Sequence, residues 1–209
     1  MTATSITSST LSQVLWPVHQ SSISISYRMI RNLILICVGS LLLAISAKIQ
    51  VPMWPVPITM QTYVVLVLGA FMGRNLALAT VSFYLMQGVA GLPVFAQGAG
   101  FAYVFGPTGG YLLGFAVSAY LMGWMAERGY DRKIIPSLAI MMLGHIVIFA
   151  FGMAWLLILN PNNLPFTESL GFVYERGLAV FSVATILKTL LAALTTCALW
   201  QVVRTKKSK

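Results

Sequence analysis

The chain has 209 residues, of which 58% are hydrophobic and 8% are charged, and its formal net charge at pH 7 is +9. A soluble domain carries about 25% charged residues, so this composition leaves too little polar surface to face water and predicts an integral membrane protein. The sparse charges also argue against a nucleic-acid-binding protein, because no basic stripe is interleaved with stacking aromatic residues. The two cysteines, Cys37 and Cys197, lie in apolar stretches without metal-site spacing, and we expect them to be small buried residues.

The N-terminal segment is rich in Ser and Thr and contains no acidic residue and no long apolar core. A cleaved secretory signal needs a charged region followed by an apolar one, so we interpret residues 1–30 as a flexible cytoplasmic tail with a short surface-lying piece around 14–18. Residues 31–203 form the predicted membrane domain. Residues 204–209 form a short basic tail, which we also place in the cytoplasm.

Six apolar segments are candidates for membrane-spanning helices, each of which needs about 20 predominantly apolar residues. In chain order they cover 33–47, 58–72, 76–90, 111–125, 134–159 and 178–203. The second and third are short and are separated by residues 73–75 alone, which is typical of tilted helices or of loops that line a cavity. The predicted fold is therefore all-α, with six transmembrane helices.

Basic residues give the orientation of these spans, because cytoplasmic connections carry an excess of Lys and Arg. One set of span ends carries ten of the 13 basic residues, the other set carries Lys48 and Arg176, and Lys188 lies within a span. This distribution predicts that both termini lie in the cytoplasm, which agrees with an even number of crossings.

The connections on the opposite side are unusual for exposed loops, which are ordinarily polar. Residues 51–62 and 91–110 are apolar, aromatic and rich in Pro and Gly. We expect them to form a lid or the lining of a cavity at the outer face, with interfacial aromatic residues and tight turns as the alternative. Residues 160–177 are more polar and predict an ordinary outer loop with a short helix.

All four acidic residues lie in connections between the predicted spans. A proton-coupled transporter uses buried carboxylates or histidine chains as relays, and His145 is the one candidate in a span, where we expect a satisfied core residue. Paired carboxylates, nucleophile motifs, Cys/His clusters and a Walker A sequence are missing from the chain. The sequence therefore predicts no enzyme, no metal and no cofactor.

Lys188 is a charged residue about ten residues inside the last apolar helix. An ionised lysine at mid-helix costs roughly 2.5–3.5 kcal/mol, and about fifteen helical residues follow it, so reaching either interface is awkward. Without an acid in the spans, we expect its partner to be a small ligand with a carboxylate or a strong carbonyl acceptor. Thr185 shares its helix face and offers a hydroxyl to the same cavity. The alternative is that Lys188 satisfies helix-end carbonyls or faces a partner subunit.

Two stretches of sequence together resemble the BioY family: IQVPMWPVPITMQT at 49–62 and LPVFAQGAGFAYVFGPTGGYLLGF at 92–115. The similarity extends over about 31–203. The resemblance implies a bundle of six helices in the bacterial cytoplasmic membrane that binds biotin near its outer face, under the loop after the first helix. It also implies partners, because such substrate-binding (S) subunits of energy-coupling-factor transporters depend on a T subunit and ABC-type ATPases.

The resemblance also suggests ligand-binding residues. Lys188 matches the pocket lysine of the family's sixth helix, Gln97 falls where the family has a polar amide residue, and Tyr111 lies near another pocket position. Gln61 and Tyr84 are further predicted ligand residues, because each is a polar group in an otherwise apolar span. The aromatic residues expected to form walls are Trp54, Phe95, Phe101, Tyr103 and Phe105.

Two further expectations come from the family. Small residues on the first helix serve as its docking face for partner subunits, and here Ser40 and Ala44 lie one turn apart beside Gly39; the alternative is packing within the chain. The family usually has Gly-Asp three residues ahead of the pocket lysine, whereas this chain has Ala184-Thr185. This departure leaves three alternatives: another group takes the role of the missing acid, the surroundings of Lys188 are more electropositive than in the family, or the affinity and the choice of substrate differ.

The predicted function is thus high-affinity biotin capture and uptake by the substrate-specific subunit of an energy-coupling-factor transporter. The alternative is a self-sufficient secondary transporter or facilitator for a small carboxylated metabolite, which would favour a buried acid in the spans. An intramembrane enzyme would need a nucleophile–base pair, and His145 has no evident partner in the sequence.

Overall fold

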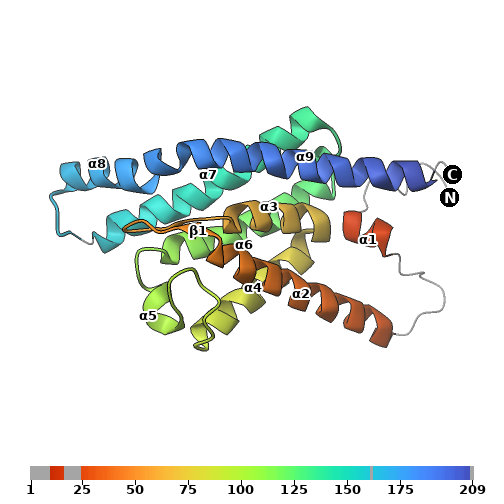
Figure 1. Cartoon of the computed structure of the whole chain (residues 1–209), viewed down its shortest axis with the longest axis horizontal. Coiled ribbons are helices and arrows are strands. Elements are labelled where there is room, and N and C mark those ends of the chain that lie inside the picture. Colours follow the sequence, from red (N-terminus) through yellow and green to blue (C-terminus); the bar gives the residue numbers. More distant parts are fainter. Residues whose placement is uncertain (1–9, 17–24, 161, 208–209) are drawn as a thin grey trace.

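The structure, a computed structural model, describes residues 10–16, 25–160 and 162–207. Its helices are α1 (Leu11–Leu15), α2 (Ile25–Lys48), α3 (Gln61–Met72), α4 (Arg74–Val89), α5 (Gly100–Val104), α6 (Gly109–Ala126), α7 (Ile134–Leu159), α8 (Phe166–Gly177) and α9 (Ser182–Lys207), with 3₁₀ turns η2 (Tyr130–Arg132) and η3 (Ala179–Phe181) (Figure 1). Two short strands, β1 (Gln50–Val51) and β2 (Ile58–Thr59), form an antiparallel hairpin in which Gln50 lies opposite Thr59.

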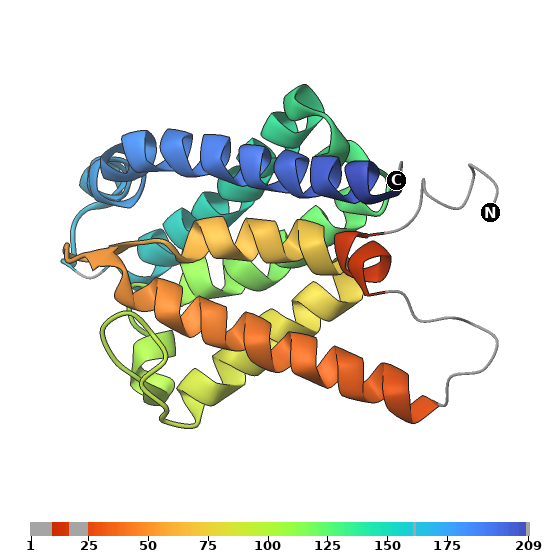
Figure 2. The ribbon, with the colours of Figure 1, turned by 45° about the vertical axis from the view of Figure 1, so that its right-hand side comes forward.

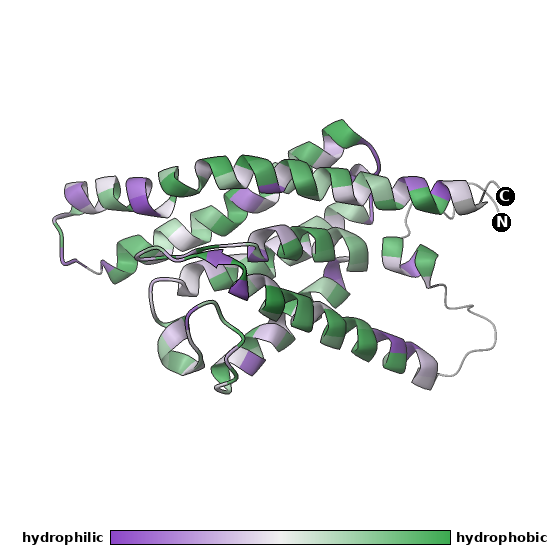
Figure 3. Ribbon diagram, in the orientation of Figure 1, coloured by the Kyte–Doolittle hydropathy of each residue, from purple (hydrophilic) through white to green (hydrophobic). Residues whose placement is uncertain are grey.

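Four stretches of the described residues are long and apolar enough to cross a membrane: Ser26–Lys48, Gly109–Ala126, Ile134–Leu159 and Phe166–Thr205. Figure 3 shows hydrophobic residues along most of their length. Helices α3 and α4 coincide with the two short predicted spans. With 12 and 16 residues they are only about 18 and 24 Å long, less than the ~30 Å hydrocarbon core. The prediction of a mostly helical membrane protein is confirmed.

The elements divide between two ends of the molecule. Figures 1 and 2 both place α1, the beginning of α2 and the C-terminal end of α9 at one end, and the hairpin, α5 and α8 at the other, which we call the hairpin end. The two apolar connections with many Pro and Gly residues therefore meet at one end, as a common role in lining a cavity requires.

Helix α6 is the centre of the bundle and packs against α3, α4 and α7. Glycines allow these close approaches: a Cβ on Gly123 would lie 2.2 Å from the backbone nitrogen of Arg74, and one on Gly114 would lie 2.9 Å from Cα of Ile148. Small residues serve the same purpose in other membrane bundles, where helices associate by close packing and not by exclusion of water.

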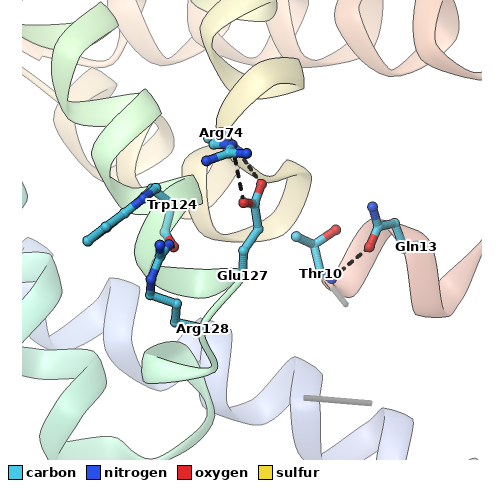
Figure 4. A network of polar contacts seen from close by, with 6 residues as sticks. All are labelled: Thr10, Gln13, Arg74, Trp124, Glu127 and Arg128. Atoms are coloured by element: carbon cyan, nitrogen blue, oxygen red, sulfur yellow. Dashed lines mark hydrogen bonds and ion pairs between the residues drawn. The ribbon is translucent and has the colours of Figure 1, made fainter. Parts of the chain in front are cut away.

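A polar network, drawn in Figure 4, joins the α3–α4 turn to the end of α6. One carboxylate oxygen of Glu127 accepts the backbone N–H of Arg74 at 3.0 Å, and the other pairs with Arg74 Nε at 3.4 Å. The Arg128 guanidinium stacks 3.6 Å above the Trp124 ring. The carboxylate thereby satisfies a donor in the first turn of α4 that the helix itself leaves free.

Helical structure continues beyond both predicted boundaries of the membrane domain. Residues 1–9 and 17–24 of the predicted tail lie outside the described residues, but α1 falls within the tail, with Leu11 fully buried against Trp200 and Val203. Helix α2 begins at Ile25, and α9 continues to Lys207. No Pro or Gly interrupts residues 25–30, so the helix has no reason to stop where the apolar segment does.

Candidate ligand-binding site

A cavity lies at the hairpin end, between the hairpin and helices α3, α6, α7 and α9. Its wall consists of Val56, Pro57, Thr59, Gln61, Thr62, Ala96, Tyr103, Thr108, Tyr111, Leu112, Phe115, Phe149, Phe181 and Lys188. A mostly apolar and aromatic wall with a few separate polar groups is typical of a site for a small organic molecule.

Lys188 is 8% exposed, and its Nζ donates a hydrogen bond of 2.6 Å to the backbone carbonyl of Thr59, at the end of β2. The protein thus offers this ammonium one neutral acceptor, a carbonyl of the hairpin. The sequence analysis did not predict this bond. Among the described residues, Lys188 has no carboxylate within ion-pair distance. The positive charge therefore lies beside the cavity without a counter-charge.

Gln61 lies on the cavity wall, whereas Tyr84 lies behind it. The Gln61 side-chain amide donates to the Tyr84 hydroxyl at 2.7 Å, and that hydroxyl donates to the Val94 carbonyl at 3.0 Å. Tyr84 is 0% exposed and does not belong to the cavity wall. Of these two predicted ligand residues, the structure brings Gln61 alone to the cavity.

Tyr111 also lies on the cavity wall, and its hydroxyl donates to the carbonyl of Gly177 at 3.0 Å. Its ring meets Phe149 edge-on with 6.1 Å between centroids. Gln97 is exposed and outside the wall, although its neighbour Ala96 is part of it. The loop after α4 therefore reaches the cavity, but through a different residue from the predicted one.

Thr185 faces away from this cavity. It lies, with Ser182 and His145, on an apolar groove between α7 and α9. Three residues along a helix lie about 60° apart around its axis, so Thr185 and Lys188 are neighbours on α9 but border different hollows, the groove and the cavity. The hydroxyl of Thr185 therefore does not belong to the wall of the cavity that Lys188 lines. His145 is buried, and its Nδ1 is bonded to Thr189 at 3.0 Å, but its Nε2 is buried without a hydrogen-bond partner among the described residues, so the expectation of a satisfied core histidine holds only in part.

Several wall residues were not predicted from the sequence. Phe115, Phe149 and Phe181 come from uniformly apolar segments, in which no periodicity indicates the inward face. Thr62 is the last residue of the motif at 49–62, but it was not among the predicted ligand residues. Its hydroxyl oxygen is buried and has no hydrogen-bond partner among the described residues. Among the predicted aromatic wall residues, Tyr103 alone lies on the cavity.

The small residues of α2 face the interior of the bundle. The Ser40 hydroxyl donates to the side-chain oxygen of Gln87 on α4, and a Cβ on Gly39 would lie 2.6 Å from Thr80. Ala44 is half-buried against the core. These contacts agree with the alternative of packing within the chain, and a role of Ser40 and Ala44 in docking stays a prediction.

Comparison with known proteins identifies the family. The sequence model of the BioY family matches residues 13–205. This chain belongs to the BioY family. The BioY family relatives include a protein named biotin transporter BioY2 from Lactococcus lactis subsp. cremoris, 32% identical over 142 residues, or 68% of this chain and 78% of the relative. A protein named probable biotin transporter BioY from Lysinibacillus sphaericus is 30% identical over 177 residues, or 85% of this chain and 90% of the relative.

A solved structure has a similar fold. The crystal structure of the S-component for biotin from an ECF-type ABC transporter matches with a TM-score of 0.71 and 24% sequence identity, over 86% of this chain and 95% of that one. This likeness confirms the fold. Family membership, fold and apolar helices together make the chain a multi-pass protein of the cytoplasmic membrane.

Proposed function

We propose that this chain captures biotin and is the substrate-specific subunit of an energy-coupling-factor transporter that takes biotin up. The observation that carries the proposal is the cavity at the hairpin end, with the buried Lys188 ammonium on its wall and no acid beside it. The names of the BioY relatives support biotin as the ligand.

The chemistry of the wall suits the chemistry of biotin. Biotin has an apolar bicyclic body, a ureido group with two N–H donors and one carbonyl acceptor, and an anionic tail. The aromatic side chains suit the body, and Lys188 suits either the carboxylate or the ureido oxygen. The free hydroxyl of Thr62 offers an acceptor for a ligand N–H.

The wider assembly is part of the same proposal. Six helices, α2, α3, α4, α6, α7 and α9, cross the membrane with both termini in the cytoplasm, and residues 31–203 are the substrate-binding domain between two cytoplasmic tails. The common position of α1 and the end of α9 in Figures 1 and 2 supports this orientation. Since the sequence has no Walker A motif, a T subunit and ABC-type ATPases supply the energy, and the chain is a transport subunit without enzymatic activity.

Direct binding tests the proposal. Titration calorimetry on the purified chain should give one biotin per chain, with weaker binding for an analogue without the carboxylate and for one without the ureido ring. No binding of biotin would contradict the proposed function. Uptake of labelled biotin by cells should require the partner subunits, and full accumulation by this chain alone would favour a self-sufficient transporter instead.

A further inference from the structure

A chain of hydrogen bonds crosses the protein behind the cavity, from α9 to the loop after α4. It begins with Lys188 Nζ, which donates to the Thr59 carbonyl at 2.6 Å, and the Thr59 hydroxyl donates to Gln61 Oε1 at 3.3 Å. Gln61 Nε2 then donates to Tyr84, which donates to the Val94 carbonyl. At Thr59 the link is covalent, because the backbone carbonyl accepts and the separate hydroxyl donates. From that hydroxyl the bonds run continuously through Gln61 and Tyr84 to Val94, and bonds in such a run polarise and strengthen one another.

Tyr84 fixes which way the Gln61 amide faces. The carbonyl of Val94 can only accept, so the single hydroxyl proton of Tyr84 goes to Val94, and the hydroxyl oxygen must accept from Gln61. Reversing the amide would set its oxygen against the phenol oxygen, with no proton between them. Among the described residues the second N–H of Gln61 has no acceptor, and Gln61 lies on the cavity wall, so this N–H is available to an acceptor on a ligand.

The same hydroxyl holds the loop after α4 against the cavity. Val94 begins a segment whose next two carbonyls are also bound, Phe95 by Lys48 Nζ at 2.7 Å and Ala96 by the Gln50 side chain at 3.1 Å. Ala96 forms part of the cavity wall. Tyr84 thus connects a wall residue on α3 with the loop segment 94–96, although it does not itself reach the cavity.

We propose that Tyr84 is a positioning residue for the ligand: it sets the Gln61 amide so that an N–H faces a ligand acceptor, and it couples occupation of the cavity to closure of the 94–96 segment. This inference rests on the proposed function, because the acceptor in question is an oxygen of the ligand. A phenylalanine at this position would fill the same space but lose both bonds, leaving a buried amide and a buried carbonyl without this partner.

Tyr84→Phe is therefore the test variant, and Tyr63→Phe is its matched control. Tyr63 also lies in a membrane helix and bonds through its hydroxyl to Thr195 at 3.0 Å, but it is outside the cavity wall and outside the chain of bonds. Calorimetry should show biotin binding weakened about tenfold or more in Tyr84→Phe and within about threefold of wild type in Tyr63→Phe. Equal affinities for the two variants would overturn the proposal.

Loop closure needs a separate measurement that general destabilisation would not reproduce. Leu92 is exposed in the same loop, so a Leu92→Cys reporter, in a background with Cys37→Ala and Cys197→Ala, can be labelled with a membrane-impermeant thiol reagent. Saturating biotin should slow labelling in the parent and in Tyr63→Phe but leave the rate unchanged in Tyr84→Phe. Full protection of Tyr84→Phe would show that the loop closes without this bond.

A double-mutant cycle separates a role of Tyr84 through Gln61 from a general loss of packing. If Tyr84 acts through Gln61, adding Tyr84→Phe to Gln61→Leu should cost less than twofold in affinity, because the amide is already gone. Additive losses would contradict the proposed role. Biotin binding by the parent and by Tyr63→Phe keeps these outcomes separate from a failure of the proposed function, which would remove binding from every variant.

Discussion

Trp200 donates its indole N–H to a carboxylate oxygen of Asp131 at 2.6 Å, and this bond fastens the end of α9 to the turn between α6 and α7. Asp131 is 0% exposed, and its other oxygen has no hydrogen-bond partner among the described residues. Burial raises the pKa of this carboxyl from 3.8 to about 6, against the opposing effects of the Trp200 bond and of the nearby Arg132 charge.

The raised pKa of Asp131 makes the free energy of unfolding depend on pH. The folded state holds the proton up to about pH 6, while the unfolded state loses it near 3.8. This contribution is therefore fully present at low pH and is lost as the pH rises through about 6, by an amount on the order of 1–3 kcal/mol. We expect the melting temperature in detergent to be higher at pH 5.5 than at pH 7.5.

Asp131→Asn should flatten this pH profile, because the amide oxygen can still accept from Trp200 but carries no titrating group. The control is Glu175→Gln, which removes an exposed acid and should leave the slope of the wild-type profile unchanged. An Asp131→Asn protein that keeps the full wild-type slope would show that another group titrates in this range.

Lys188→Met should weaken biotin binding by more than tenfold, which corresponds to about 1.4 kcal/mol, because it removes the ammonium from the cavity wall while keeping a side chain of similar length. Calorimetry at constant pH measures the change. Lys133→Met removes an exposed charge at the beginning of α7 and should bind like the wild type. Unchanged affinity in Lys188→Met would mean that the lysine serves the hairpin through Thr59 and not the ligand.

Two threonines provide a matched test of which hydroxyl the ligand meets. Thr62→Val removes a free hydroxyl from the cavity wall and should weaken biotin binding roughly three- to tenfold. Thr185→Val removes a hydroxyl from the groove between α7 and α9 and should leave the affinity within about threefold of wild type. The reverse order, measured side by side by calorimetry, would place the ligand next to Thr185.

Helix boundaries were predictable from the sequence where polar residues bound an apolar run. The span predicted at 134–159 coincides with α7, because Lys133 and Asn160 bound an apolar run on both sides. The first helix was predicted too short, since apolarity marks where lipid begins and not where helical hydrogen bonding begins. The α3–α4 pair was also predictable, because two short apolar segments at 58–72 and 76–90 are separated by a turn that begins with Gly73.

Some residues of the cavity wall were predictable, because a polar residue is rare in an apolar segment. Lys188 and Gln61 stood out as polar residues in apolar segments, Tyr111 was suggested by the family resemblance, and all three lie on the cavity wall. Rarity also selected Tyr84, and the shared helix face with Lys188 selected Thr185, but both lie elsewhere. The direction of a side chain depends on how the helices rotate against one another. That rotation is set by close contacts among glycines and neighbouring backbones, for which a uniformly apolar sequence contains no periodic pattern.

Gly123→Ala should destabilise the bundle strongly. The added methyl group would lie 2.2 Å from the backbone nitrogen of Arg74, and backbone atoms cannot rotate away as a side chain can. Helix α6 would have to move from the α3–α4 turn, which also breaks the bonds between Arg74 and Glu127 drawn in Figure 4. We expect a loss on the order of 3 kcal/mol, seen as a lower melting temperature in detergent. Gly171→Ala is the matched control, because Gly171 is exposed, a Cβ there meets nothing within 4 Å, and a position inside a helix should gain slightly from alanine. Equal melting temperatures for the two variants would show that α6 does not depend on this close approach.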